Sequence, residues 1–195
     1  MRHSSMNGDG TMTTEKDARL TRMLRAVVWG GAVFAFLVPV VAKLTLAIPW
    51  TTFDFVAWAV MLLVAAGVCE IALRLSGRLA YRAGVIVAVG TGFLITWSNL
   101  AVGIIGDENN PLNQIFFGVI AIAVVGSVMA RFRARGMAVA MAVTAVAQFA
   151  TGFVALMDEQ IVFGIVTVFA LGWLLAAGLF REAARAEAET AKAQA

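Results

Sequence analysis

Residues 53–78, FDFVAWAVMLLVAAGVCEIALRLSGR, hold one complete example of the unit from which this chain is built. An acidic residue, Asp54, stands near the start, a long apolar run follows, and two arginines, Arg74 and Arg78, stand at the end. A helix needs about 20 mostly apolar residues to cross the hydrocarbon of a bilayer. The run at about 53–74 therefore predicts a membrane-spanning helix, and its basic end indicates the cytoplasmic side.

The whole chain repeats this pattern. Its 195 residues are 61% hydrophobic and 14% charged, whereas soluble domains are about half apolar and about a quarter charged. Six stretches are long and apolar enough to span, at about 26–48, 53–74, 83–105, 114–130, 137–157 and 161–180. We therefore expect an all-α membrane protein with six transmembrane helices arranged as three hairpins. The predicted organisation is a disordered N-terminal tail (1–18), a single six-helix transmembrane domain (19–180) and an Ala-rich cytoplasmic helical tail (181–195).

The charged residues predict the orientation of the spans. Every basic residue except Lys43 falls on one side of the six predicted spans, and the loops on the other side carry acids such as Asp54, Asp107 and Glu108. Because Lys and Arg are retained on the cytoplasmic side during insertion, both termini are predicted to be cytoplasmic.

The N-terminal region leaves two questions open. Residues 19–42 resemble a secretory signal, and cleavage after Ala42 would leave five spans. The apolar run resumes after Lys43, which favours an uncleaved first helix. Translation could begin at Met1 or at Met12, and the polar residues 1–18 are expected to be disordered in either case.

Arginine pairs four residues apart end each even-numbered span. One interpretation is a basic ring that contacts lipid headgroups or a partner, and the favoured one is three copies of the same topology signal. The pairs are Arg74 and Arg78, Arg131 and Arg135, and Arg181 and Arg185. Glu70, four residues before Arg74, is expected to form a local ion pair rather than a proton relay.

Small and polar residues form stripes along the third and fifth spans. Such faces allow close helix packing in lipid, so spans 3, 4 and 5 are predicted to pack together. The stripes are Gly84, Ala88, Gly92 and Thr96, and Ala140, Thr144, Gln148 and Gly152. Gln148 needs a hydrogen-bond partner, and Asn99 is the candidate, although their depths differ by about 7 Å.

Four of the five asparagines lie in residues 99–113, NLAVGIIGDENNPLN. Pro111 suits the first position of a helix and Asn110 suits the cap before it, but capping does not explain the other asparagines. The alternative is an outward-facing vestibule for a ligand or ion, floored by buried amides. Its candidate residues are Asn99, Asp107, Glu108, Asn109, Asn113 and Gln148. Residues 107–118, DENNPLNQIFFG, lack the sixth-position Gly and the final Glu of an EF-hand loop, so no metal is assigned.

Several classes of function are disfavoured by what the sequence lacks. It contains no Walker A, HExxH, GxSxG or CxxC motif, and its single His and single Cys make His-based catalysis and a disulfide framework untenable. We expect neither an enzyme nor a cofactor, and no nucleic-acid partner. The expected partners are the lipid bilayer and either a membrane protein or a second copy of the chain.

The segment WSNLAVGIIGDENNPLN (97–113), followed by ARFRARGMA (130–138), resembles a group of small, uncharacterised bacterial multi-span membrane proteins that carry an NLAVGIIG-acid-x-NP segment. The resemblance covers roughly residues 53–150. It implies a location in the bacterial cytoplasmic (inner) membrane, and it assigns no catalytic residue.

Two functions follow as hypotheses from different classes. The first is a non-enzymatic membrane protein with a structural, accessory or complex-assembly role. The second is a small transporter or channel subunit that admits its substrate at residues 107–113 and passes it along Asn99 and Gln148. A continuous polar cavity from the loop to mid-membrane would favour the second.

Overall fold

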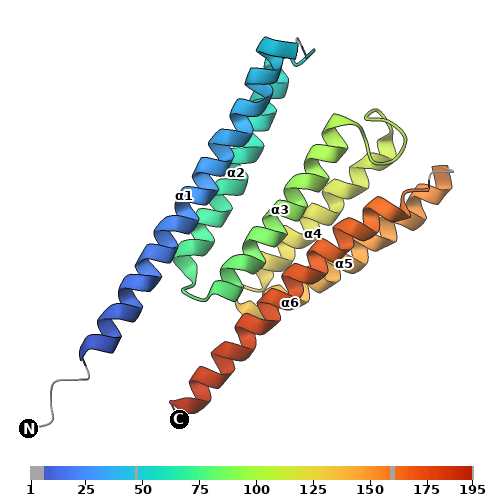
Figure 1. Ribbon diagram of the computed structural model, residues 1–195. Coiled ribbons are helices and arrows are strands. Elements are labelled where there is room, and N and C mark those ends of the chain that lie inside the picture. Colours follow the sequence, from blue (N-terminus) through green and yellow to red (C-terminus); the bar gives the residue numbers. More distant parts are fainter. Residues whose placement is uncertain (1–6, 47, 159–160, 195) are drawn as a thin grey trace, which may run out of the picture. The chain divides into compact units, whose positions relative to one another are not determined.

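The computed structural model describes the backbone of residues 7–46, 48–158 and 161–194, and the side chains of residues 18–46, 48–157 and 161–194. Within these ranges the chain forms six α-helices and two short 3-10 turns, and no strand (Figure 1). The helices are α1 (Asn7–Leu46), α2 (Thr52–Leu75), α3 (Leu79–Ala101), α4 (Gln114–Met129), α5 (Ala134–Ala155) and α6 (Phe163–Ala193); the turns are η1 (Pro111–Asn113) and η2 (Leu156–Asp158). All six helices are long and apolar enough to cross a membrane, which confirms the predicted all-α, six-span fold.

Some predicted boundaries were wrong. The third span was expected at 83–105, but α3 ends at Ala101 because Gly103 and Gly106 adopt positive φ angles of 71° and 69°, which no helix accommodates. Disorder was expected throughout 1–18, whereas α1 begins at Asn7. Residues 1–6 lie outside the described part of the chain.

The chain divides into two compact units, residues 1–77 and residues 78–195. In the first, α1 and α2 form a hairpin. The predicted ion pair between Glu70 and Arg74 is confirmed, since Arg74 Nε lies 2.9 Å from Glu70 Oε1. Arg25 of α1 forms a second ion pair with Glu70, at 2.8 Å. At the other end of α2, Thr51 and Asp54 form a capping box in which each side chain accepts the other residue's backbone N–H.

The second unit is a four-helix assembly of α3–α6 in which α6 is central. The most extensive packing joins α6 to α5 and to α3, while α4 packs mainly on α5. The prediction that spans 3, 4 and 5 pack on one another therefore missed α6. The small residues of α3 in fact receive aromatic side chains of α6: a Cβ on Gly84 would lie 3.2 Å from the Phe180 ring, and one on Gly92 would lie 3.5 Å from Trp173.

The turn between α4 and α5 is held by a buried tyrosine. Arg131 and Phe132 have φ angles of 50° and 56°, a conformation that costs energy for residues with a Cβ. The Tyr81 hydroxyl donates to the Phe132 carbonyl at 2.7 Å, and the Tyr81 ring meets Phe180 edge-on at 5.2 Å between centroids. Residues of α3 and α6 thus fix the turn.

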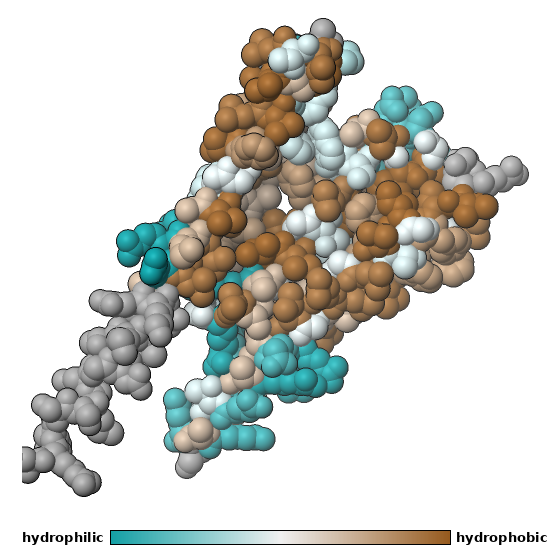
Figure 2. Space-filling model, in the orientation of Figure 1, coloured by the Kyte–Doolittle hydropathy of each residue, from teal (hydrophilic) through white to brown (hydrophobic). Residues whose placement is uncertain are grey.

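Apolar side chains cover the helices of each unit, and hydrophilic ones gather over the C-terminal end of α6 (Figure 2). The faces of a single helix differ in burial: Phe149 on α5 is 42% exposed, whereas Gln148 beside it is fully buried. Such outward apolar faces suit contact with lipid.

The contacts of α6 predict opposite effects for two Gly→Ala substitutions. A Cβ on Gly172 would lie 2.5 Å from Thr91 Oγ1, whereas nothing lies within 4 Å of one on Gly178. We expect Gly172→Ala to destabilise the protein by about 1–3 kcal/mol through overpacking. Gly178→Ala should be neutral, or stabilising by up to about 1 kcal/mol, because Ala favours the helix. Thermal unfolding of the detergent-purified variants measures both; equal effects would contradict the close α3–α6 contact.

Candidate functional site

The segment of residues 102–113, here called the Asn113 loop, is organised by one buried side chain. Asn113 Oδ1 accepts hydrogen bonds from the backbone N–H groups of Ile104 (3.1 Å) and Ile105 (2.8 Å). Its Nδ2 donates to the carbonyls of Ile105 (3.1 Å) and Asp107 (2.6 Å). An asparagine side chain has two acceptor sites and two donors. All four are used within the loop, so Asn113 has no capacity left for a ligand.

The neighbouring asparagines also act on the backbone. Asn99, 4% exposed at the end of α3, donates from Nδ2 to the Asn113 carbonyl at 3.0 Å and so ties α3 to the start of α4. Asn110 Oδ1 accepts from Leu112 N at 2.9 Å with Pro111 at the first position of η1, which confirms the predicted cap. The backbone N–H of Asn109 donates to Asp107 Oδ1 at 2.8 Å.

The loop is tightly folded over an apolar layer. A Cβ on Gly103 would lie 2.3 Å from the backbone of Asp107, so only glycine fits there. Ile105 and Phe116 are fully buried and Ile104 is 7% exposed, whereas Asp107, Glu108 and Asn109 are exposed. The charged groups of the loop and its apolar residues are therefore separated.

The residues of the predicted vestibule do not form one open site. Asp107, Glu108 and Asn109 lie on the exposed part of the loop, Asn113 is saturated, and Asn99 and Gln148 are buried. In the described part of the chain, no three His, Cys, Asp or Glu side chains gather where they could hold a metal ion.

Gln148 does not pair with Asn99, so the predicted amide clasp was wrong. Gln148 is fully buried on α5, and neither its Oε1 nor its Nε2 bonds to any described residue. The Asn99 donor is used on the Asn113 carbonyl, and its Oδ1 is likewise unpartnered, as is the Trp173 indole Nε1 on α6. By contrast, the buried Thr144 hydroxyl donates to the Ala140 carbonyl of its own helix at 2.8 Å.

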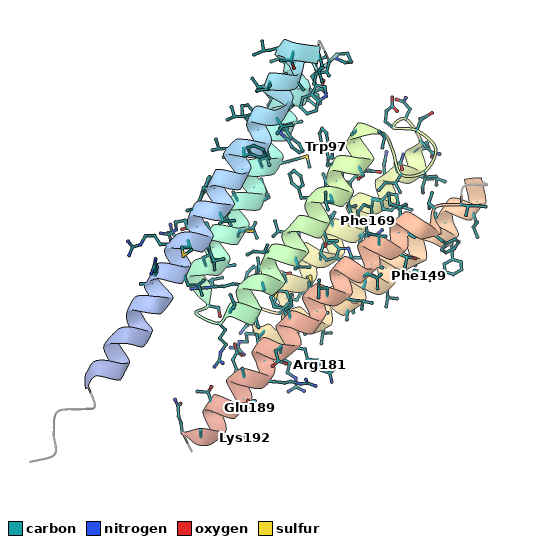
Figure 3. All side chains as sticks on the ribbon, in the orientation of Figure 1. Trp97, Phe149, Phe169, Arg181, Glu189 and Lys192 are labelled. Carbon is teal, nitrogen blue, oxygen red and sulfur yellow. The ribbon has the colours of Figure 1, made fainter. Side chains whose placement is uncertain are left out.

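The arginine pairs have separate roles. Arg74 binds Glu70 in the first unit. Arg78 lies 3.9 Å from Glu187 and donates to Thr190 at 3.3 Å, which holds the C-terminal part of α6 against the start of α3. The Arg185 guanidinium lies 3.8 Å from Glu182. The remaining members of the predicted basic ring are exposed; these are Arg131, Arg135 and Arg181, the last labelled in Figure 3.

Sequence reasoning missed Arg25, Tyr81 and Trp173. Arg25 and Tyr81 act through contacts with residues 45 and 51 positions away, which no local pattern reveals. Tyr81 did carry a signal, because it is the only tyrosine in the chain and stands beside Arg82 at the start of a span.

No protein-family model matches the chain, and no match was found among curated proteins or solved structures.

The saturation of Asn113 predicts a large effect of its removal. Asn113→Ala leaves the buried N–H groups of Ile104 and Ile105 without their acceptor, and we expect a loss of about 3 kcal/mol or more. Asn109→Ala is the matched control, because the described bond of Asn109 uses its backbone N–H. Limited proteolysis of the loop and thermal unfolding measure the difference. Equal protease resistance of the two variants would contradict the role assigned to Asn113.

Proposed function

We propose that this chain is a non-enzymatic integral membrane protein of the bacterial cytoplasmic membrane with a structural, accessory or complex-assembly role. The observation that carries the proposal is the Asn113 loop. Its central amide is fully used on the backbone, and Ile105 and Phe116 are fully buried whereas its acids are exposed. A loop of this kind presents a fixed shape, which supports recognition of a partner over entry of a solute.

The external surface supports the same role. The acids Asp107 and Glu108 project from a rigid segment, which suits recognition of a complementary surface, since a preorganised loop loses little entropy on binding. The apolar outer faces of the helices suit lipid or another membrane helix. We propose the bilayer and either a membrane protein or a second copy of the chain as partners.

The orientation is part of the proposal. With both termini cytoplasmic, the Asn113 loop faces the periplasm and the arginine-rich turns face the cytoplasm. A green fluorescent protein fused after Ala195 should fluoresce, and alkaline phosphatase fused there should be inactive. Phosphatase fused after Glu108 should be active. The reverse pattern, or an active phosphatase at both positions, would contradict the proposed topology.

The function itself is tested by reconstitution. In liposomes loaded with a cation-sensitive dye, the purified protein should give no flux of K⁺, Mg²⁺ or Ca²⁺ above that of empty liposomes. Thermal stability should be unchanged by these ions, both in the native protein and in the double variant Asp107→Asn, Glu108→Gln. Flux, or ion-dependent stabilisation that the double variant abolishes, would overturn the structural role.

A small transporter or channel subunit is the second candidate, favoured by one observation. The four unpartnered atoms of Asn99, Gln148 and Trp173 all lie in the interior of the α3–α6 unit. A transport pathway needs polar groups at this depth. The flux measurement above distinguishes the two candidates.

A further inference from the structure

Three buried side chains in the α3–α6 unit carry polar atoms without a protein partner. Gln148 is fully buried, Trp173 is 2% exposed and Asn99 is 4% exposed. The unpartnered atoms are Gln148 Oε1 and Nε2, Trp173 Nε1 and Asn99 Oδ1. A buried polar atom without a hydrogen bond costs about 1–3 kcal/mol, and more in hydrocarbon. Four such atoms in one small unit would lower the stability of the fold substantially unless a bound molecule forms hydrogen bonds with them.

The three residues lie at successive depths of the same interior. Thr91 on α3 touches Gly172 on α6. Because these helices are antiparallel, Asn99, which is eight residues further along α3, is level with Gly164.

The depth of Gln148 follows from the contacts of α5. Gly152 on α5 contacts Phe163 and Val166 of α6, which lie on either side of the level of Gly164. Gln148 is four residues below Gly152, a step of roughly 6 Å. Trp173 starts deeper still, nine residues along α6 from Gly164.

The direction of the side chains brings these depths closer together. Side chains tilt toward the N-terminus of their own helix. Both α3 and α5 begin at the arginine-rich end of the unit, so Asn99 and Gln148 lean away from the Asn113 loop. The N-terminus of α6 is at the loop end, so Trp173 leans toward the loop. The tilts therefore bring Trp173 closer to the depth of Gln148, whereas Asn99 leans in the same direction as Gln148 and stays about one helical turn nearer the loop, a gap that a ligand bound by both amides can bridge.

We propose that this interior binds a small, uncharged ligand that both donates and accepts hydrogen bonds, with Gln148 at its centre. Gln148 Nε2 and Trp173 Nε1 supply donors, and Gln148 Oε1 and Asn99 Oδ1 supply acceptors. None of the three side chains is charged, so the complementary ligand is neutral: water, or a small solute with the same hydrogen-bonding groups. The site is independent of the structural role proposed above, and it stands whether or not anything crosses the membrane.

Replacing Gln148 by leucine separates an occupied site from a dry one. Removing a polar atom that has no partner is neutral or stabilising, whereas removing one that holds a ligand leaves the ligand and its other partners unsatisfied. We therefore expect Gln148→Leu to lower the Tm by several degrees. Met141→Leu, an apolar exchange at a 2% exposed position of the same helix, is the control for repacking. A Tm equal to or above that of the native protein would overturn the proposal.

A double-mutant cycle tests whether one ligand links two helices. Trp173→Phe removes the indole N–H and replaces the indole by a smaller ring. Each of the two single variants should weaken binding at the same site. The double variant Gln148→Leu, Trp173→Phe should therefore lose less stability than the sum of the single losses. Strict additivity would show that the two side chains share no ligand.

A measurement on the unaltered protein covers the case in which a variant fails to fold. In liposomes, solid-state NMR of ¹⁵N-labelled protein should show magnetisation transfer from water to the Trp173 indole N–H, identified by its loss in Trp173→Phe. If transfer persists when urea or formamide is added, the ligand is water; if either probe displaces water and raises the Tm, the ligand is a neutral solute. Absence of transfer from water and from both probes would overturn the proposal.

Discussion

Hydrocarbon cannot hydrogen-bond, so every polar group that enters it must find its partner within the protein, and helices can approach only where their side chains are small. In this chain, the small side chains that close helix packing requires lie at the contacts of α6. Glycines on α3 and α5 receive the large side chains of α6, as where Gly152 meets Phe163, and Gly172 of α6 in turn receives Thr91. The positions of Asn99, Gln148 and Trp173 follow from this interlocking.

The requirement that every polar group find a hydrogen-bond partner is met unevenly. At the membrane edge it is met in full: the Asn113 amide satisfies four backbone groups of a loop that would otherwise bury them, and Asn110 caps the turn that follows. One turn deeper, the Gln148 amide meets no described partner. The same chemical group thus serves as a fixed structural element at one depth and as an available binding group at another.

Charged side chains in the structure are paired mainly where they stabilise helix contacts. Glu70 is held by two arginines, one on its own helix and one on α1, and this joins the two helices of the first unit. Arg78 binds Glu187 and Thr190 and holds the C-terminal part of α6. Pairs of this kind are structural, and they leave Asp107 and Glu108 as the exposed acids of the Asn113 loop.

The sequence by itself determined whatever depends on near neighbours. Six spans, the Asn110 cap and the Glu70–Arg74 pair all follow from composition or from contacts within four residues, and each is present in the structure. Only the tertiary structure decided that α6 stands between α3 and α5, that Asn113 is saturated, and that Asn99 and Gln148 stay apart. The saturation of Asn113 depends on how residues 104–107 fold around its side chain. The other two outcomes depend on the relative depth of helices distant in sequence. A stripe of small residues shows that a face can pack closely, but the partner and the register are chosen by the shapes of all four helices together.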